Sequence, residues 1–409
     1  MTRVKSKVLV DLTPLQTPGG ARGIGRYIRE LAWGLAALPS GEFDDIELLA
    51  LTSLNWSGRH TVTSDFAGFL ESRGTDLLDP SDYYSWAYRQ RLSLWLAAGR
   101  LGVQAVHITD PHGTPRFLGL AGAKRIVTCH DIVPTRFPEH YFGMRDGGAT
   151  IGRYIERERY RTADLVLAVS DATRTDVCSL LGVPEKRVWR VYGGIHVESW
   201  AAEPRVDPGP VLVRFGLAER NYVLYVGGAD WRKNIEGMLA AIARVNAMGL
   251  QLDLAWAGHL EGQKVEDVKS MVAEVGILGS FHYLGYVPDD DLSILYRGAV
   301  AHLLVSRLEG FGLTVVEAMA CGCPVVTTQA GSLAEVAGDA ALSVDPEDPS
   351  AIAAALERLL REPGLRADLV ARGRARAPKF SRYELGRSTA EAYRRFLLGD
   401  NRQRTSTRT

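Results

Sequence analysis

Short apolar runs alternate with amphipathic stretches in the first half of the chain. Residues 7–12 form the first run and precede a glycine-rich segment. Apolar residues then recur at the i, i+3, i+4, i+7 spacing of one helix face, namely Ile28, Leu31, Ala32 and Leu35. Further strand-like runs lie at residues 105–108, 125–129 and 165–169. Because strands that alternate with helices are typical of a parallel sheet, this half is predicted to be a doubly wound α/β domain.

The second half shows the same alternation after a proline-rich connection. Residues 201–210 contain three prolines, which disfavour regular structure, so the domain boundary is placed there. A strand is predicted at residues 222–226, and the helix after it has a regular apolar face made of Ile235, Met238, Leu239 and Ile242. Later strands are predicted at residues 252–257, 281–284, 301–305 and 324–327. The predicted domains are therefore 1–205 and 206–385, two similar units that face each other across a cleft.

The C-terminal end is predicted to be a helix followed by a tail. Tyr393, Phe396 and Leu397 form an apolar stripe on a helix over residues 386–400. Residues 401–409 are polar and are predicted to be disordered.

Size and charge narrow the class of protein. The chain has 409 residues, more than the roughly 250 to 300 that one hydrophobic core fills, so two domains are expected. Its 48 basic residues balance 48 acidic ones, which argues against a nucleic-acid partner. No apolar run approaches the roughly 20 residues that span a bilayer, and the start does not resemble a signal peptide. The four scattered cysteines predict buried thiols, and the protein is expected to be cytoplasmic.

The segment from Glu309 to Glu317 carries the strongest chemical signal. It reads Glu-Gly-Phe-Gly-Leu-Thr-Val-Val-Glu and joins a predicted strand to a helix that begins near Leu313. Free backbone N–H groups at this helix start, those of Gly312 and Leu313, would bind a diphosphate. Carboxylates repel phosphate, so the two glutamates are better explained as acceptors for hydroxyl groups on either side of it. The spacing predicts a nucleotide-sugar site, with Phe311, Gly312 and Leu313 lining the ligand.

Positive charge for the diphosphate is found at the end of another strand. Arg232 and Lys233 follow the strand 222–226 and two glycines, and they precede a helix. Arginine presents a planar fork of donors and lysine a point charge, and both would stabilise a departing nucleoside diphosphate. In the first half, His130 ends the strand 125–129, and the glycine-rich turn with Gly23 and Gly25 is suited to close ligand approach.

Taken together, these motifs resemble the retaining glycosyltransferases of family GT4 over nearly the whole chain. The Glu-x7-Glu segment is the strongest match. It is supported by motifs at residues 23–31, 128–131, 169–173, 232–234 and 284–287. Gly228 departs from the pattern, because many relatives carry a basic residue at that position.

The resemblance implies a GT-B fold, with two Rossmann-like domains and a C-terminal helix that packs back on the N-terminal domain. It also implies roles for individual residues: Glu317 at the ribose, Glu309 at the donor sugar, Arg232 and Lys233 at the diphosphate, Tyr286 and Val287 beside the base, and Gly23 and His130 completing the site from the first domain. The family chemistry retains the anomeric configuration without an enzymic nucleophile and without a metal or other cofactor.

The expected reaction is hexosyl transfer from a nucleoside-diphosphate sugar to a hydroxyl group of a glycan, glycolipid or glycosylated metabolite. The resemblance is to mannosyltransferase-like members, which favours GDP-mannose, with a UDP-sugar as the second choice. Aromatic and basic residues at 83–91 and 153–161 would contact a lipid-linked acceptor or the inner membrane surface, or simply form solvated helix faces.

Three other interpretations stay open at the level of sequence. Asp289 and Asp291 would hold a divalent ion in a metal-dependent transferase, although a helix N-cap explains them better. A nicotinamide-dependent dehydrogenase would need a glycine fingerprint that the first strand lacks. A two-lobed sugar-binding protein without catalytic activity would not need Arg232 and Lys233 beside an anion site.

Overall fold

A computed structural model describes residues 5–17, 20, 23–54, 60–72, 94–111, 120–141, 148–260 and 262–399. It divides into two compact units, one made of Met1–Ile195 with Ser381–Thr409 and the other of His196–Phe380. The predicted boundary at 205/206 falls ten residues later than this division. The reason is local packing, because Trp200 lies edge-on against Tyr296 of the second unit, with ring centroids 5.9 Å apart. The predicted tail at 401–409 lies outside the described residues.

The sheet of the first unit has the strand order β3-β2-β1-β4-β5-β6-β7 in the described part of the chain. Its strands are β1 (Ser6–Asp11), β2 (Ile46–Leu54), β3 (His60–Thr63), β4 (Ala105–Ile108), β5 (Lys124–Cys129), β6 (Leu165–Ala168) and β7 (Val188–Arg190). All pairings are parallel except that of β3 with β2. The predicted strands β1, β4, β5 and β6 are confirmed. The apolar pattern missed β2, which is nearly continuous and so fits strand or helix, and the short edge strands β3 and β7.

Helices cover this sheet. They are α1 (Gly23–Ala36), α2 (Phe66–Glu71), α4 (Val133–Arg136), α5 (Pro138–Tyr141), α6 (Gly148–Arg161), α7 (Asp171–Leu181) and α17 (Arg382–Leu398), with short 3-10 turns η1 (Thr13–Gln16) and η5 (Glu185–Arg187). The buried core between helices and sheet is formed by residues such as Leu9, Val106, Val127 and Val166. Apolar side chains on both faces of these strands account for the continuous hydrophobic runs in the sequence.

The second unit has a wholly parallel sheet with the order β10-β9-β8-β11-β12-β13 across the described residues. Its strands are β8 (Tyr222–Val226), β9 (Asp253–Ala257), β10 (Phe281–Gly285), β11 (Ala301–Leu304), β12 (Val325–Thr328) and β13 (Leu342–Val344). The order reverses between β8 and β11, which are neighbours although they are far apart in the sequence. Ligands of such sheets bind beyond the carboxyl ends of the strands at this reversal.

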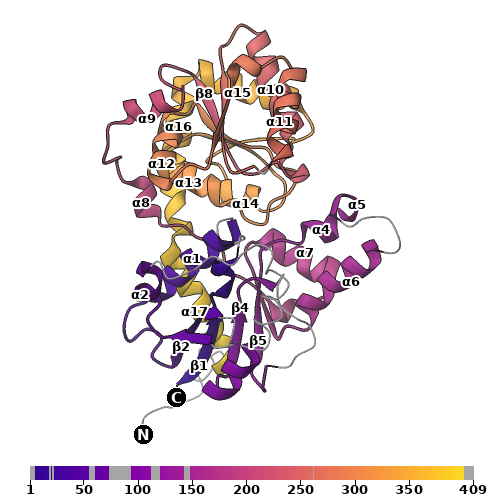
Figure 1. The fold of residues 1–409 in the computed structure, drawn as a ribbon, viewed down its shortest axis with the longest axis vertical. Coiled ribbons are helices and arrows are strands. Elements are labelled where there is room, and N and C mark those ends of the chain that lie inside the picture. Colours follow the sequence, from indigo (N-terminus) through magenta and orange to yellow (C-terminus); the bar gives the residue numbers. More distant parts are fainter. Residues whose placement is uncertain are drawn as a thin grey trace, which may run out of the picture. The chain divides into compact units, whose positions relative to one another are not determined.

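Helices flank the second sheet on both sides (Figure 1). They are α8 (Val197–Ala201), α9 (Pro208–Arg214), α10 (Ile235–Ala247), α11 (Gln263–Glu274), α12 (Asp289–Gly298), α13 (Leu313–Cys321), α14 (Leu333–Ala337), α15 (Pro349–Arg361) and α16 (Pro363–Arg376), with the 3-10 turns η6 (Trp231–Lys233), η7 (Leu278–Ser280) and η8 (Ala377–Phe380). Helix α10 packs on α15, and α13 packs on α16. The predicted α/β class is confirmed for both units.

The C-terminal helix α17 returns to the first unit and packs on α1, as predicted. It begins four residues before the predicted start because the Ser381 hydroxyl caps it by accepting a hydrogen bond from the Glu384 amide. Two glycines let the helices approach closely. A Cβ on Gly34 would lie 2.0 Å from the Arg382 carbonyl oxygen, and one on Gly386 would lie 2.2 Å from the Gly34 carbonyl carbon.

A buried hydrogen-bond chain also fixes α17. His107 on β4 has its Nδ1 2.6 Å from the Tyr393 hydroxyl and its Nε2 2.8 Å from the hydroxyl of Thr128 on β5. Burial, with a smaller contribution from the charge of His130, lowers the pKa of His107 to about 3, so the ring is neutral. Each ring nitrogen therefore has a partner, and α17 is joined to the central strands.

We expect Gly34→Ala to destabilise the first unit. The new methyl group has no room against the Arg382 carbonyl, so α17 must move, and overpacking of this kind costs about 1–3 kcal/mol. Urea unfolding followed by circular dichroism measures the change. Gly23→Ala on the same helix is the matched control, because a Cβ on Gly23 would have no described heavy atom within 4 Å. Equal stability of the two variants would contradict the close packing.

Candidate active site

The loops that follow β8 and β11 lie side by side at the carboxyl edge of the second sheet. The amide of Arg307, after β11, donates a 2.7 Å hydrogen bond to the carbonyl of Arg232, after β8. Asn234 has a left-handed backbone (φ +54°), and its Nδ2 donates to the carbonyl of Val305 at 3.2 Å. The Asp230 carboxylate accepts from the Arg232 amide at 3.1 Å and so shapes the η6 turn. Neighbouring strands and these bonds together determine where the side chains of η6 lie.

Glu309 joins the two predicted cations. Its Oε2 is 2.5 Å from Arg232 Nη1, and its Oε1 is 2.5 Å from Lys233 Nζ. The Ser306 hydroxyl donates a third hydrogen bond to Oε1, at 2.7 Å. Glu309 is only 8% exposed, so its charge is stable there only because it is paired and hydrogen-bonded. The structure therefore brings together three residues that the sequence placed in two separate loops.

The electrostatics of this triad keep Glu309 ionised. Burial alone would raise the pKa of its carboxyl group, but the charges of Arg232 and Lys233 and the hydrogen bonds outweigh it and lower the pKa to about 2. For Lys233, burial lowers the pKa, and Glu309 only partly offsets this effect. A carboxylate with so low a pKa is a weak base. Glu309 is therefore suited to be a fixed negative charge and a hydrogen-bond acceptor.

The backbone around Glu309 is held from the other side by the loop that precedes α14. The Ser332 hydroxyl is 3.0 Å from the carbonyl oxygen of Glu309 and 2.9 Å from that of Phe311. Gly331 (φ +59°) passes so close that a Cβ on it would lie 2.7 Å from the Glu309 carbonyl oxygen. These contacts hold the backbone that carries the Glu309 carboxylate.

Helix α13 begins directly after this segment. Gly312 (φ +97°) is its N-cap residue, and glycine has no side chain with which to cap the amides of Leu313 and the residues that follow. Phe311 is buried and lies edge-on to Phe380, with centroids 5.6 Å apart. The predicted helix start near Leu313 is confirmed, and its amides lie next to the triad in sequence.

Glu317 lies in different surroundings from Glu309. Its side chain, in the second turn of α13, has no exposed surface, and its Oε2 accepts a 3.2 Å hydrogen bond from the Tyr296 hydroxyl on α12. The sequence predicted two acceptors that bracket a ligand from accessible positions. A contact of Glu317 with a ribose stays a prediction, and it requires the carboxylate to become accessible.

The residues predicted beside the base follow β10. Gly285 (φ +65°) ends the strand, Tyr286 is 73% exposed and Val287 is buried. Because β10, β9 and β8 are consecutive in the sheet, this turn lies at the same edge as η6. The exposed Tyr286 ring is free of the protein core.

The first unit places His130 directly after β5. Its Nε2 lies 2.8 Å from the carbonyl oxygen of Thr109, and the ring is edge-on to Tyr27, with centroids 4.8 Å apart. Gly25 is needed for internal packing, since a Cβ there would lie 2.1 Å from the Gly20 carbonyl oxygen, whereas Gly23 has space around it. Both glycines were predicted to let a ligand approach the backbone closely. Gly25 instead lets another part of the protein backbone, at Gly20, approach it.

Asp289 and Asp291 lie in the first turn of α12. The N-cap predicted at these aspartates, directly before Leu292, is wrong, because α12 already begins at Asp289 and its N-cap residue is Pro288. Asp291 pairs with Arg214 at 2.5 Å. Within the described ranges, no group of three or more His, Cys, Asp or Glu side chains is arranged to hold a metal ion.

One of the two predicted membrane-facing segments can be located in the structure. Of the predicted surface segments, 83–91 lies outside the described residues, and 153–161 lies on α6, where Tyr154 is 56% exposed. No helix in the described part of the chain is both long and apolar enough to cross a bilayer. Contact with a membrane surface stays a prediction.

Sequence reasoning overlooked the residues that support the triad. Arg307 donates to the Trp231 carbonyl at 2.9 Å, stacks on the Trp231 ring and pairs with Glu347 at 2.7 Å, and so braces η6. Ser306 and Ser332 hold Glu309. Ser306 and Arg307 directly follow a predicted strand, and this position could have marked them as site residues. Ser332 has no such mark in the sequence, because only the folded structure brings its loop next to Glu309.

Two doubly wound units, the return of α17 to the first unit and a cationic triad at the strand reversal of the second define a glycosyltransferase of the GT-B fold. The chain belongs to glycosyltransferase family 4. Residues 21–199 match the family model "Glycosyltransferase Family 4", and residues 214–376 match "Glycosyl transferases group 1". This membership decides against a dehydrogenase and against a sugar-binding protein without activity.

Individual relatives agree with the family. The O-antigen chain mannosyltransferase B of Escherichia coli is 34% identical over 402 residues, covering 95% of this chain and 99% of that protein. The D-inositol 3-phosphate glycosyltransferase of Frankia alni is 27% identical, covering 94% and 98%. Among solved structures, sucrose-phosphate synthase from Thermosynechococcus elongatus has a TM-score of 0.72 at 19% identity, covering 97% and 100%. Anabaena HepE in complex with UDP-glucose has a TM-score of 0.69 at 18% identity, covering 95% and 99%.

The depressed pKa of Glu309 predicts an acid-sensitive second unit. Its pKa of about 2 is below the ordinary value of 4.5, so the ionised form stabilises the fold above pH 4.5, and this stabilisation is lost as the pH falls towards 2. We expect Glu309→Gln to cost about 3 kcal/mol at neutral pH, because it removes the carboxylate that pairs with both Arg232 and Lys233. The difference from wild type should shrink below pH 4.5.

Chemical unfolding at a series of pH values measures this difference. The matched control is Glu347→Gln, because the Glu347 carboxylate pairs with Arg307 at the surface and is 62% exposed. If the difference in unfolding free energy between wild type and Glu309→Gln stays constant down to pH 2, Glu309 is not ionised in the folded protein.

Proposed function

We propose that this protein transfers a hexosyl residue, with retention of the anomeric configuration, from a nucleoside-diphosphate sugar to a hydroxyl group of a glycan or glycolipid. GDP-mannose is the proposed donor. The Arg232–Glu309–Lys233 triad at the strand reversal of the second unit is the observation that carries the proposal. It combines two cations for a diphosphate with a fixed acceptor for sugar hydroxyls.

The triad has donor groups to spare for a diphosphate. A guanidinium has five N–H groups and an ammonium three, so Arg232 and Lys233 keep their bonds to Glu309 while they donate to phosphate oxygens. No side chain caps the start of α13, so its first backbone amides are further donors, and the helix dipole there favours an anion. Glu309 holds both cations in place before the donor arrives, which reduces the ordering that binding requires.

The chemistry assigned to these residues is electrostatic. The bond from the anomeric carbon to the phosphate oxygen breaks, and the bond to the acceptor oxygen forms on the same face of the sugar. The acceptor's proton passes to an oxygen of the leaving diphosphate, and Arg232 and Lys233 stabilise the negative charge that develops there. Glu309 accepts hydrogen bonds from the donor sugar and forms no covalent bond. Because two cations supply the positive charge, we propose that no metal is needed.

The donor is inferred from the relatives. The Escherichia coli protein that is 34% identical is named as a mannosyltransferase of the O-antigen chain. This name favours a mannosyl donor and a glycan chain as the acceptor. HepE was solved with UDP-glucose, which makes a UDP-sugar the second candidate.

Lys233→Ala should lower the turnover number by roughly two to three orders of magnitude, as expected for the loss of one preorganised charge that stabilises the leaving group. Release of GDP from GDP-mannose in the presence of a mannoside acceptor measures the rate. Lys269→Ala is the control, because Lys269 is an exposed residue of α11 that pairs with Glu266 on the same helix. Unchanged turnover in Lys233→Ala would remove Lys233 from the mechanism.

GDP-mannose should raise the unfolding temperature more than UDP-glucose does, since a ligand at about 100 times its Kd stabilises a protein by roughly 2.7 kcal/mol. Thermal unfolding with a panel of nucleotide sugars, all with EDTA, tests this. NMR of the anomeric proton should then show an α-linked product from the α-linked donor. A β-linked product would exclude retention, and activity lost in EDTA but restored by manganese would exclude metal independence.

A further inference from the structure

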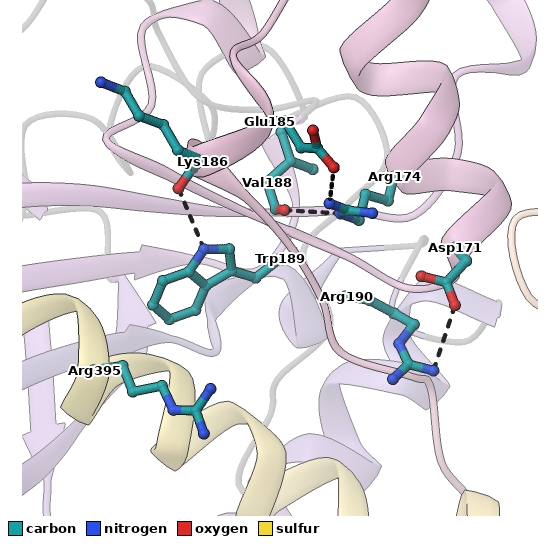
Figure 2. A pocket seen from close by; sticks show the side chains of 8 residues that line it. All are labelled: Asp171, Arg174, Glu185, Lys186, Val188, Trp189, Arg190 and Arg395. Carbon is teal, nitrogen blue, oxygen red and sulfur yellow. Dashed lines mark hydrogen bonds and ion pairs between the residues drawn. The ribbon is translucent and has the colours of Figure 1, made fainter. Parts of the chain in front are cut away.

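The first unit contains a pocket that is lined by none of the candidate active-site residues. It runs along the edge strand β7 and has a volume of about 600 Å³, within the range of small-molecule sites. Its lining comes from three places, namely β7 with the η5 turn before it, the first turns of α7, and the last turns of α17 (Figure 2).

Trp189 provides a flat apolar surface in this pocket. Its indole N–H donates a 3.3 Å hydrogen bond to the carbonyl of Lys186, which fixes the orientation of the ring, and the side chain is half-buried. In Figure 2 the indole lies between Lys186 and Arg395. A rigid aromatic ring with one polar edge suits ligands that have an apolar face and a polar rim, as a pyranose has.

Two arginines that line the pocket are held in place before any ligand binds. Arg174 forms an ion pair with Glu185 and donates from its Nε to the Val188 carbonyl at 3.2 Å. Arg190 pairs with Asp171 at 3.5 Å and stacks on the Tyr192 ring, with its Cζ 4.1 Å from the ring centroid. Because these guanidinium groups are already ordered, binding a ligand costs them little conformational entropy.

The mixture of charges favours a hydroxyl-rich ligand over an anion. The lining contains four basic side chains and two carboxylates, those of Asp171 and Glu185. Carboxylates repel phosphate, whereas sugar hydroxyls both donate to carboxylates and accept from guanidinium groups. The indole is suited to the C–H face of a sugar ring.

One end of the pocket lies at the carboxyl edge of the sheet, where His130 follows β5. Arg190 ends β7, and Asp171 begins α7 shortly after β6. Strands β5, β6 and β7 are consecutive neighbours, so β7 lies about 10 Å from β5, two strand spacings away. A glycan whose end is beside His130 therefore has only a short distance to cover along the same edge.

We propose that this pocket is a second carbohydrate site, which binds residues of the acceptor glycan behind its reacting end. The proposal rests on the proposed function, because it takes the acceptor to be a glycan chain. Charged side chains also protect sheet edges from association, and this role alone would predict no sugar binding.

Binding of α-linked mannooligosaccharides to the full-length protein tests the site. Saturation-transfer NMR and calorimetry would compare wild type with Trp189→Ala and Arg190→Ala. We expect both variants to bind mannohexaose about tenfold more weakly. Trp95→Ala is the matched control, because Trp95 is a 42% exposed tryptophan of the same unit outside the pocket, and its loss should change nothing.

Kinetics separate this site from the catalytic one. In wild type the acceptor KM should fall as the mannooligosaccharide lengthens, and in Arg190→Ala this trend should flatten, with the kcat for the shortest acceptor unchanged. Arg190 is exposed, so its removal leaves the fold intact even if Trp189→Ala unfolds. If the chain has no transferase activity, the binding measurement still decides whether the pocket binds carbohydrate.

Two results would overturn the proposal of a second carbohydrate site. One is that wild type and both pocket variants bind mannohexaose equally. The other is that the pocket binds pyrophosphate in preference to the oligosaccharide, with the same loss in Arg190→Ala, which would make it an anion site.

Discussion

Three charged side chains meet in the second unit, where Glu309 is buried and Arg232 and Lys233 are partly buried beside it. Glu309 is 8% exposed and bonds to Arg232 and Lys233 through different carboxylate oxygens. The ions offset one another's desolvation only while the loops after β8 and β11 remain in register. Asn234 and Arg307 maintain that register with hydrogen bonds from one loop to the other. The charge triad thus depends on the strand order that makes these two loops neighbours.

The first unit has a comparable dependence on a distant part of the chain. Its sheet is covered by α17, which follows the whole of the second unit in sequence. Close contact at Gly34 and Gly386 and the His107–Tyr393 hydrogen bond hold the helix to α1 and β4. The C-terminal helix is therefore part of the first unit's core, and it also supplies Arg395 to the pocket along β7.

The two glutamates of the Glu-x7-Glu segment have distinct physical surroundings. Glu309 is fixed as an anion by two cations, and the resulting pKa of about 2 makes it unsuited to accept a proton. Glu317 is enclosed beside Tyr296. In the proposed mechanism the two cations and the leaving diphosphate perform the chemistry, and the carboxylate of Glu309 positions the cations and the donor sugar.

The sequence by itself determined the class of fold and all three members of the triad. Periodicity is a local property, so β4 and β8 were predicted with their observed bounds, and residue type at strand ends identified Arg232, Lys233 and Glu309. Only the tertiary structure decided which loops are neighbours, how deeply Glu317 is buried and that Ser332 holds the Glu309 backbone. It also revealed the short edge strand β7 with its pocket. Those features depend on strand order and close packing between segments far apart in the chain, and no local pattern encodes them.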